Sequence, residues 1–261
     1  MNDSDLVLCE RRGRAAWLTL NRPEAANALS LATLKRLRVL LAEIAADSEV
    51  WTVVLTGAGT KAFCAGADLK ERRGLNEAQV RDFVATIRAT MDEVAALPQP
   101  VIAALNGHAF GGGCELALAC DLRVMNAGAQ IGLTETSLAI IPGAGGCVRL
   151  PRLVGLAKAK EMILLAKRLS AEEALNCGLV NEVCAAGATA ESAERISAAL
   201  LRNGPLALRA AKAALDGGLD LPLAQALEHE ASCYQRIIPT ADRLEALAAF
   251  AEKRAPEFQG R

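Results

Sequence analysis

Hydrophobic residues in the first half of the chain follow two alternating patterns. Short, nearly unbroken apolar runs occur at 16–20, 51–56, 101–105 and 122–125. Such runs are typical of strands that are buried on both faces. Longer stretches between them carry apolar residues three and four positions apart, which is the spacing of one helix face. This alternation of strands and helices predicts an α/β fold.

Two of the predicted helices begin at capping patterns. Ser30 precedes the first, and a serine there can accept a hydrogen bond from a free N–H of the first turn. Asn76 and Gln79 have the spacing of a capping box at the start of the second. The positions expected to face the core are Leu34, Leu37, Leu41 and Ile44 in the first helix and Val80, Phe83, Val84, Ile87, Met91 and Val94 in the second.

Helical spacing dominates the second half of the chain. Ser170 and Glu173 form another capping box, and Thr240 is expected to open the last helix. We therefore expect an α/β core over residues 1–190 and a helical region over residues 191–261. A helical tail with its own apolar face is often an oligomer contact.

Composition narrows the class of protein. The 261 residues are 52% hydrophobic and 23% charged, which is typical of a folded domain and not of a disordered chain. A net charge of −1 favours neither nucleic acid nor an anionic membrane as a partner. No apolar run reaches the roughly 18–20 residues of a membrane helix. Because residues 1–5 are acidic and unlike a signal peptide, we expect a cytoplasmic protein.

The 8 cysteines are expected to be reduced thiols, since disulfide frameworks belong to short secreted chains. There is no C-x-x-C pair, and the two histidines, His108 and His229, lie far apart in sequence. We therefore expect no metal site.

Two glutamates in apolar segments, Glu115 and Glu135, are the strongest candidates for chemistry. A carboxyl group in apolar surroundings holds its proton more tightly, so it can act as an acid or a base near neutral pH. Glu115 follows the glycines at 111–113, where a strand turns into a helix expected to start near Cys114. The free N–H groups of such a turn can hold an oxyanion, although a tightly packed turn accounts for three glycines equally well.

Other candidate motifs are weaker. Residues 63–70 offer small residues with free N–H groups after a buried strand. Residues 57–62 match G-x-G-x-x-A, but the segment after them does not fit a dinucleotide-binding unit. Residues 143–146 suit a phosphate-binding turn or a proline-led helix start. His108 is more simply structural than a base, and Cys114 has no histidine placed in sequence to activate it.

Taken in order, these segments resemble the enoyl-CoA hydratase/isomerase (crotonase) superfamily over almost the whole chain. The resemblance is carried by residues 21–23, 27–29, 65–70, 111–117, 120–121, 135, 141–146, 242–243 and 250–254. It implies a spiral of ββα turns as the core and a helical C-terminal region that forms trimers, which usually pair into hexamers. It also implies an acyl-CoA thioester substrate. Coenzyme A is then part of the substrate, and no separate cofactor is expected.

The resemblance also implies roles for particular residues. The backbone N–H groups of Ala67 and Gly112 would hold the thioester oxygen. Glu115 would act chiefly on water and Glu135 chiefly on the C2 proton, although the two share both tasks. Coenzyme A would contact Ala65, Ala67, Asp68, Leu69, Lys70 and Gly112, together with Phe250 and Lys253, which in some relatives come from a neighbouring subunit. The chain departs from the usual pattern at residues 147–148, where Cys-Val replaces Thr-Gln.

Having both glutamates favours an enoyl-CoA hydratase, which adds water across the C2–C3 double bond. Residues 63–72, 115–121, 138–143 and 238–245 look especially like the methylglutaconyl-CoA hydratase branch, so a branched, acidic acyl chain from leucine breakdown is one expected substrate. A short-chain enoyl-CoA of fatty acid metabolism is the other.

Two alternatives stay open at this stage. One is an enoyl-CoA isomerase or another crotonase-type activity, because isomerases of the superfamily generally keep only the second glutamate. The other is a non-catalytic relative that binds acyl-CoA or RNA. Lys35, Arg36 and Arg38 form only a small basic cluster on the first helix, which is more simply a solvated face.

Overall fold

The computed structural model describes residues 3–261; Met1 and Asn2, part of the acidic N-terminal stretch considered above, lie outside the described residues. Over the described residues, the strands form two sheets, with the orders β1-β2-β3-β5-β7-β10 and β4-β6-β8-β9. The strands of the first sheet are β1 (Val7–Arg12), β2 (Ala15–Leu20), β3 (Thr52–Gly57), β5 (Val101–Leu105), β7 (Leu122–Asn126) and β10 (Glu182–Cys184). Those of the second are β4 (Ala62–Cys64), β6 (His108–Phe110), β8 (Gln130–Gly132) and β9 (Leu169–Ser170).

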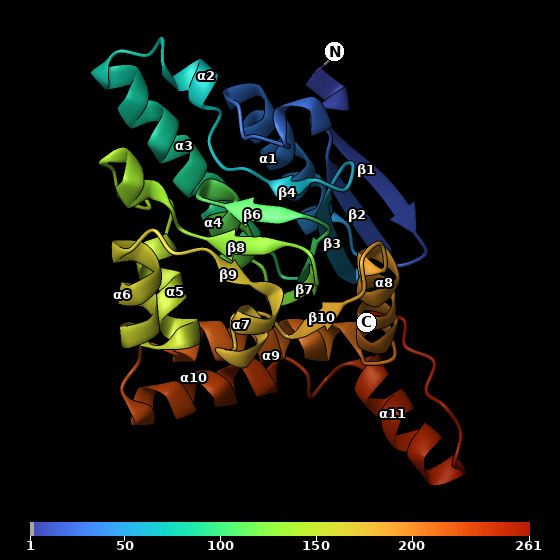
Figure 1. Cartoon of the computed structure of the whole chain (residues 1–261). Helices are drawn as coiled ribbons and strands as arrows, with labels where there is room; N and C mark the ends of the chain where they lie inside the picture. The colour runs from blue at the N-terminus through green and yellow to red at the C-terminus, as the bar shows by residue number, and fades with distance from the viewer. Residues whose placement is uncertain (1–2) are drawn as a thin grey trace.

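Helices surround these sheets (Figure 1). They are α1 (Leu31–Ala46), α2 (Leu69–Arg72), α3 (Glu77–Ala95), α4 (Gly112–Ala119), α5 (Gly146–Val154), α6 (Leu156–Leu164), α7 (Ala171–Asn176), α8 (Thr189–Leu201), α9 (Pro205–Gly218), α10 (Leu223–Gln235) and α11 (Ala241–Glu252). Single 3-10 turns occur at η1 (Asp3–Asp5), η2 (Pro23–Ala25) and η3 (Glu135–Leu138).

The chain winds as a spiral, and each turn adds one strand to each sheet. β3 is followed by β4, β5 by β6 and β7 by β8. Strands β2, β3, β5 and β7 run parallel. Helix α3 follows the β3–β4 pair in the chain, and α4 follows the β5–β6 pair. The predicted α/β core of ββα turns and the helical C-terminal region are therefore confirmed.

The predicted helix caps form as expected. The Ser30 hydroxyl accepts a hydrogen bond from the first turn of α1, with an oxygen–nitrogen distance of 3.2 Å. Asn76 and Gln79 bond reciprocally at the start of α3, at 2.9 and 3.0 Å. Ser170 and Glu173 do the same at α7, at 2.8 and 3.1 Å. Each cap satisfies N–H groups that a helix start leaves without an intrahelical partner.

Several elements differ from the sequence-based expectation. The sequence pattern does not predict β1, because only its first residue, Val7, is buried and the residues after it do not alternate between apolar and polar. β4, β6, β8 and β9 span two or three residues each, too few to carry a periodic signal. Helix α4 begins at Gly112, two residues before the expected start near Cys114.

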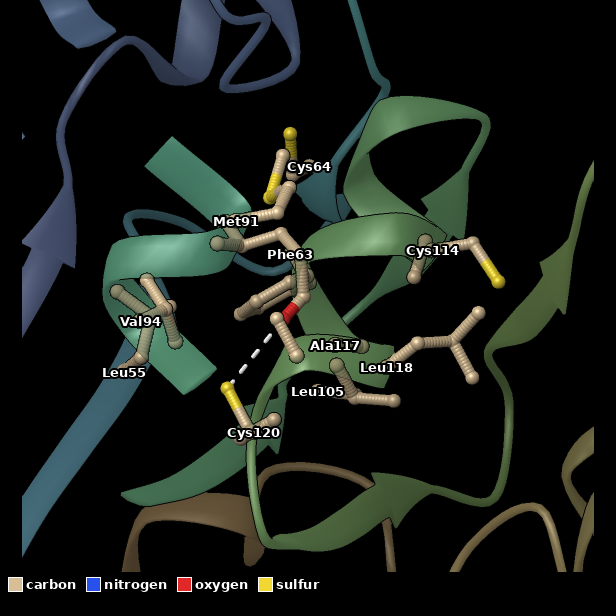
Figure 2. Packing of buried hydrophobic residues seen from close by; sticks show 14 of the residues in the cluster. Leu55, Phe63, Cys64, Met91, Val94, Leu105, Cys114, Ala117, Leu118 and Cys120 are labelled. Carbon is tan, nitrogen blue, oxygen red and sulfur yellow. Dashed lines mark hydrogen bonds between the residues drawn. The ribbon is translucent and has the colours of Figure 1, made fainter. Parts of the chain in front are cut away.

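The main apolar core lies between the sheets and helices α1, α3 and α4. Figure 2 shows Phe63, Met91 and Val94, from β4 and α3, packed against Ala117 of α4. All eight cysteines are free thiols. Burial raises the pKa of Cys64 and Cys120 to about 12, so these thiols stay protonated and serve as small apolar side chains.

Helix α8 covers the opposite face of the first sheet. Its Ala193 is buried against a cluster that includes Trp17, Val54 and Ile102. Because α8 spans Thr189–Leu201, the division expected between residues 190 and 191 falls inside a helix that packs on the sheet. Beyond it, α9 and α10 run side by side below the sheets, and α11 projects from the body at the lower right of Figure 1.

We predict that Gly113→Ala lowers the free energy of unfolding by about 3 kcal/mol in urea denaturation, because overpacking a closed interior forces backbone shifts. A Cβ on Gly113 would collide with the carbonyl oxygen of Cys64, where α4 crosses β4. The control is Gly128→Ala, whose Cβ would lie 3.5 Å from the Asn126 side chain, an ordinary contact. Equal stability of the two variants would contradict this close packing.

Candidate active site

A cavity of about 730 Å³ opens between α2, α3, the start of α4 and the segment around η3. Its walls are mostly apolar, with two carboxyl groups and two guanidinium groups among them. The lining residues are Ala65, Gly66, Ala67, Leu69, Arg72, Val80, Phe83, Val84, Ile87, Phe110, Gly111, Gly112, Glu115, Thr134, Glu135, Leu138, Ile140, Ile141, Gly143, Ala144 and Arg168. An apolar pocket with a few convergent polar groups is the usual form of a small-molecule site.

The segment at Gly66 lies directly against the start of α4. Gly66 has a φ of +94°, and a Cβ there would lie 2.8 Å from the Phe110 carbonyl oxygen and 3.0 Å from the Gly112 nitrogen. A Cβ on Gly112 would in turn lie 3.5 Å from the Ala67 nitrogen. Glycine is needed at position 66 because it adopts this left-handed conformation freely and has no side chain to separate the two backbones.

Two backbone N–H groups are left available by this contact. Gly112 is the first residue of α4, where an N–H has no intrahelical acceptor. Ala67 forms a parallel bridge with Leu29, but the two hydrogen bonds that join these segments involve residues 66 and 68. The Ala67 N–H therefore points away from Leu29. Within residues 3–261, neither N–H donates a hydrogen bond, so together they can receive one oxygen atom.

Glu115 lies one turn into α4, a helix in which every residue is buried. Its side chain is 3% exposed, and Oε1 accepts hydrogen bonds from the N–H groups of Ala144 (2.7 Å) and Gly146 (2.9 Å). Burial raises the pKa of this carboxyl, while the two amides act in the opposite direction. Hydrogen bonds of this kind stabilise the ionised form of a buried carboxyl group.

Glu135 opens η3 on the other side of the same cavity. Its Oε1 would lie 3.3 Å from a Cβ on Gly111, so it sits beside the glycine turn. Its Oε2 is buried and has no hydrogen-bond partner among the described residues. Burial, followed by the negative charge of Glu115, raises the pKa of Glu135 to about 7. This group can therefore take up or release a proton near neutral pH.

The two predicted glutamates and the residues of the two N–H groups, Ala67 and Gly112, line the same cavity. A carbonyl oxygen bound at Ala67 and Gly112 would be polarised by two donors and by the positive end of α4. Both carboxyl groups line the cavity that such a carbonyl would enter. This arrangement suits reactions that add or remove protons beside a polarised carbonyl.

Of the other loop residues predicted to contact coenzyme A, some line the cavity and some do not. Ala65 and Leu69 line the cavity, whereas Lys70 is exposed outside its lining. Asp68 caps α2 by accepting from the Lys70 and Glu71 N–H groups at 3.0 and 3.3 Å, and it pairs with Arg22 at 3.0 Å. Its contacts make Asp68 a residue that shapes the loop.

Phe250 and Lys253 do not reach this cavity within one chain. Phe250 is 86% exposed on α11, and Lys253 is the left-handed residue that ends that helix. Figure 1 shows α11 at the opposite end of the molecule from α2 and α3. A contact between these residues and a ligand in the cavity would require a neighbouring subunit.

Sequence reasoning missed several features of the site. Val80 and Val84 were expected in the core, but they are half-buried and line the cavity, because the same face of α3 contacts both the core and the cavity. Within residues 143–146, the N–H groups of Ala144 and Gly146 donate to Glu115. A bound phosphate is therefore not needed to account for this glycine-rich turn. His108 accepts from the Gln130 N–H at 3.0 Å and stacks on Phe110, consistent with a structural role.

Among residues 3–261, no three His, Cys, Asp or Glu side chains gather in a way that could hold a metal ion. Over the same part of the chain, each helix is too short or too polar to cross a bilayer.

The family model for enoyl-CoA hydratase/isomerase matches residues 10–261. The chain is 52% identical over 260 residues to YngF of Bacillus subtilis, a provisionally assigned enoyl-CoA hydratase/isomerase, with 100% of both chains covered. It is 44% identical over 255 residues to human mitochondrial methylglutaconyl-CoA hydratase, covering 96% of this chain and 75% of the relative.

Other comparisons agree. The chain is 41% identical over 251 residues to the short-chain-enoyl-CoA hydratase of Clostridium acetobutylicum, with 96% of each chain covered. Its structure matches the crystal structure of an enoyl-CoA hydratase from Bacillus anthracis with a TM-score of 0.97 and 50% identity, covering 98% of this chain and 100% of the other. These matches confirm the crotonase-type fold.

The raised pKa of Glu135 predicts how stability depends on pH. The folded state holds this proton with a pKa of about 7 and the unfolded chain with one near 4.5, so ionisation of Glu135 opposes folding. The penalty is absent below pH 4.5, grows as the pH rises to about 7 and is then constant. We expect Glu135→Gln to gain stability over wild type across this window, by on the order of 2 kcal/mol after screening by solvent.

Urea unfolding of both proteins at intervals from pH 4 to pH 8 measures this difference. Glu24→Gln, which changes an exposed glutamate outside the cavity, is the matched control. A flat difference for Glu135→Gln would mean that the raised pKa is wrong.

Proposed function

The chain belongs to the enoyl-CoA hydratase/isomerase family, and we propose that it is a hydratase that adds water across the C2–C3 double bond of a 2-enoyl-CoA thioester. The observation that carries this proposal is the presence of two carboxyl groups, Glu115 and Glu135, beside two unused N–H groups in one cavity. Coenzyme A enters as part of the substrate, and the proposed chemistry uses no separate cofactor.

The thioester oxygen is held between the N–H groups of Ala67 and Gly112. Attack of water at C3 moves electrons toward this oxygen, and an enolate-like charge develops there. Because the two donors are already oriented, they stabilise this charge more than the neutral ground state. The loss of one such donor costs other enzymes about 3–4 kcal/mol of transition-state stabilisation.

The two glutamates divide the proton transfers. Glu115, whose ionised form is supported by two amides, chiefly orients the water and accepts its proton as the C3–O bond forms. Glu135, with a pKa of about 7, chiefly delivers a proton to C2. One proton leaves water and one arrives at C2, so the pair returns to its starting charge once a proton has passed between the two groups.

An isomerase is the second candidate. Glu135 alone can remove a proton from one carbon and return it to another, and its pKa of about 7 suits that task. The hydratase remains the better proposal, because Glu115 is a second carboxyl group in the cavity that an isomerase does not need.

A non-catalytic RNA-binding relative is less well supported. Of the small basic cluster on α1, Arg38 forms a bidentate pair with Glu93 of α3 at 2.6–3.0 Å. A neutralised arginine contributes little to phosphate binding. In a non-catalytic acyl-CoA carrier, the paired glutamates would have no chemical role.

A cationic side chain in the cavity supports an acyl chain with an acidic end. The cavity wall at α3 and after η3 is apolar, yet Arg72 of α2 lines the same cavity, half-buried, and has no ion pair within residues 3–261. A carboxylate at the far end of the acyl group would supply the missing partner. We propose 3-methylglutaconyl-CoA as the first substrate to test, with a short-chain enoyl-CoA as the alternative.

The exposed apolar residues of the C-terminal helices support an oligomer. Leu215, Leu223 and Leu227 of α9 and α10 are more than half exposed. Several large apolar side chains exposed on two packed helices are typical of an association face. We propose a trimer or a pair of trimers, in which Phe250 and Lys253 of one subunit approach coenzyme A bound to its neighbour. Roles in leucine degradation or fatty acid metabolism depend on the substrate, and a cytoplasmic location stays a prediction.

We predict that purified protein removes the conjugated-enoyl absorbance of crotonyl-CoA or 3-methylglutaconyl-CoA. Glu115→Gln and Glu135→Gln should each lower turnover at least about 100-fold, because each removes a proton-transfer group. The surface variant Glu24→Gln should retain full turnover.

Each outcome of this assay separates the candidates. If wild-type protein hydrates neither thioester but moves the double bond of a 3-enoyl-CoA, and Glu115→Gln keeps that activity, the isomerase is the better assignment. If folded wild-type protein turns over neither thioester, the hydratase proposal is wrong.

Arg72→Met is predicted to lower kcat/KM for 3-methylglutaconyl-CoA about 10-fold or more while changing that for crotonyl-CoA less than about threefold. A charge-assisted hydrogen bond contributes about 1.5–3 kcal/mol, and only the first substrate has a distal carboxylate to receive one. The matched control is Arg73→Met, at an exposed neighbour outside the cavity lining. Equal losses for both substrates would exclude Arg72 as the specificity residue.

A further inference from the structure

Arg149, in the first turn of α5, folds back over the loop that holds Glu115. Gly145 in that loop has a φ of +103°, and a Cβ there would collide with Nη1 of Arg149. The glycine therefore permits both the left-handed turn and the return of the arginine side chain across it. Arg149 itself is partly buried, with 21% of its side chain exposed.

The guanidinium group is held at two points. Nη1 donates to the carbonyl oxygen of Ala144 at 3.1 Å, and Nη2 donates to Oδ1 of Asp92 at 2.7 Å. Asp92 lies on α3, the same helix that supplies Val84 and Ile87 to the cavity wall. Arg149 thus links the cavity wall to the loop between η3 and α5.

The contact with Ala144 has a direct consequence for Glu115. The N–H of Ala144 donates to Glu115 Oε1, and its carbonyl oxygen accepts from Arg149, so residue 144 is held from both sides. The second amide on Oε1 comes from Gly146, just beyond the turn that Arg149 spans. If the turn rotated, both amides would move together.

We propose that Arg149 is a positioning residue, which holds the turn at residues 144–146 so that two amides fix one oxygen of Glu115 and leave the other for the water. This proposal rests on the proposed hydratase function for its catalytic meaning. Its geometric part, the control of the Glu115 carboxyl by Arg149, is independent of the reaction.

The charges around Glu115 give this arrangement a pH signature. Glu135 on η3, Arg149 on α5 and the thiols of Cys114 and Cys147 interact electrostatically with it, and Arg72 and Arg168 line the same cavity. Arg149 lowers the pKa of Glu115, as do the Ala144 and Gly146 amides. Removing Arg149 weakens all three effects, so the pKa of Glu115 should rise.

The first experiment compares Arg149→Met with Arg152→Met. Arg152 lies one turn further along α5 and pairs with Asp220 at 3.0 Å, away from the cavity. We expect Arg149→Met to lower kcat about 10-fold or more with KM within about threefold, and to move the acid limb of the pH profile to higher pH. Arg149→Lys should restore part of the rate, and Arg152→Met should behave as wild type.

A double-mutant cycle tests whether Arg149 acts through Glu115. In a Glu115→Gln background, Arg149→Met should change kcat by less than about twofold, because the group that it positions is already lost. Full additivity of the two substitutions would overturn the proposal.

A titration that needs no catalysis separates this proposal from the proposed function. NMR of protein labelled with carboxyl-¹³C glutamate reports the Glu115 pKa in wild type and in Arg149→Met. The Glu115 signal is assigned by its disappearance in Glu115→Gln. A higher pKa in the variant supports the proposal even if wild type hydrates no thioester, and an unchanged pKa overturns it. If Arg149→Met does not fold, Arg149→Gln replaces it in this titration, and the same rise of the Glu115 pKa is expected.

Discussion

A carboxyl group enclosed in an apolar interior must be hydrogen-bonded or must keep its proton. Glu115 lies in that position, on a helix with no exposed residue. The N–H groups of Ala144 and Gly146 supply these hydrogen bonds to Glu115. Both can reach it because the chain turns sharply at Gly145. The site therefore depends on a loop that is remote from Glu115 in sequence and pressed against it in space.

The second constraint is the close approach of two backbone segments. The start of α4 and the segment at Gly66 touch with no side chain between them, and this contact brings the Ala67 and Gly112 N–H groups together. Figure 2 shows Cys114, Ala117 and Leu118 of α4, all three of which belong to the buried apolar core. A rigid helix start beside a tight turn keeps two donors aimed at one point before any substrate arrives.

The two glutamates differ because their surroundings differ. Glu115 has amide partners for Oε1, whereas Oε2 of Glu135 is buried with none among the described residues. Burial and the charge of Glu115 then raise the pKa of Glu135 to about 7. Identical side chains thus become one group whose ionised form is hydrogen-bonded by two amides and one that exchanges its proton near neutral pH, as acid–base chemistry requires.

The sequence by itself determined the α/β core, the helix caps at Ser30 and Asn76, and the placement of Glu115 just after a glycine turn, because these follow from local spacing and backbone freedom. Short strands such as β4 carry too few residues for a periodic signal. Arg72 and Arg149 look like any surface arginine in the sequence. Only the tertiary structure decided that one lines the cavity and that the other holds the Glu115 loop, since both contacts join segments that the chain brings together through its spiral.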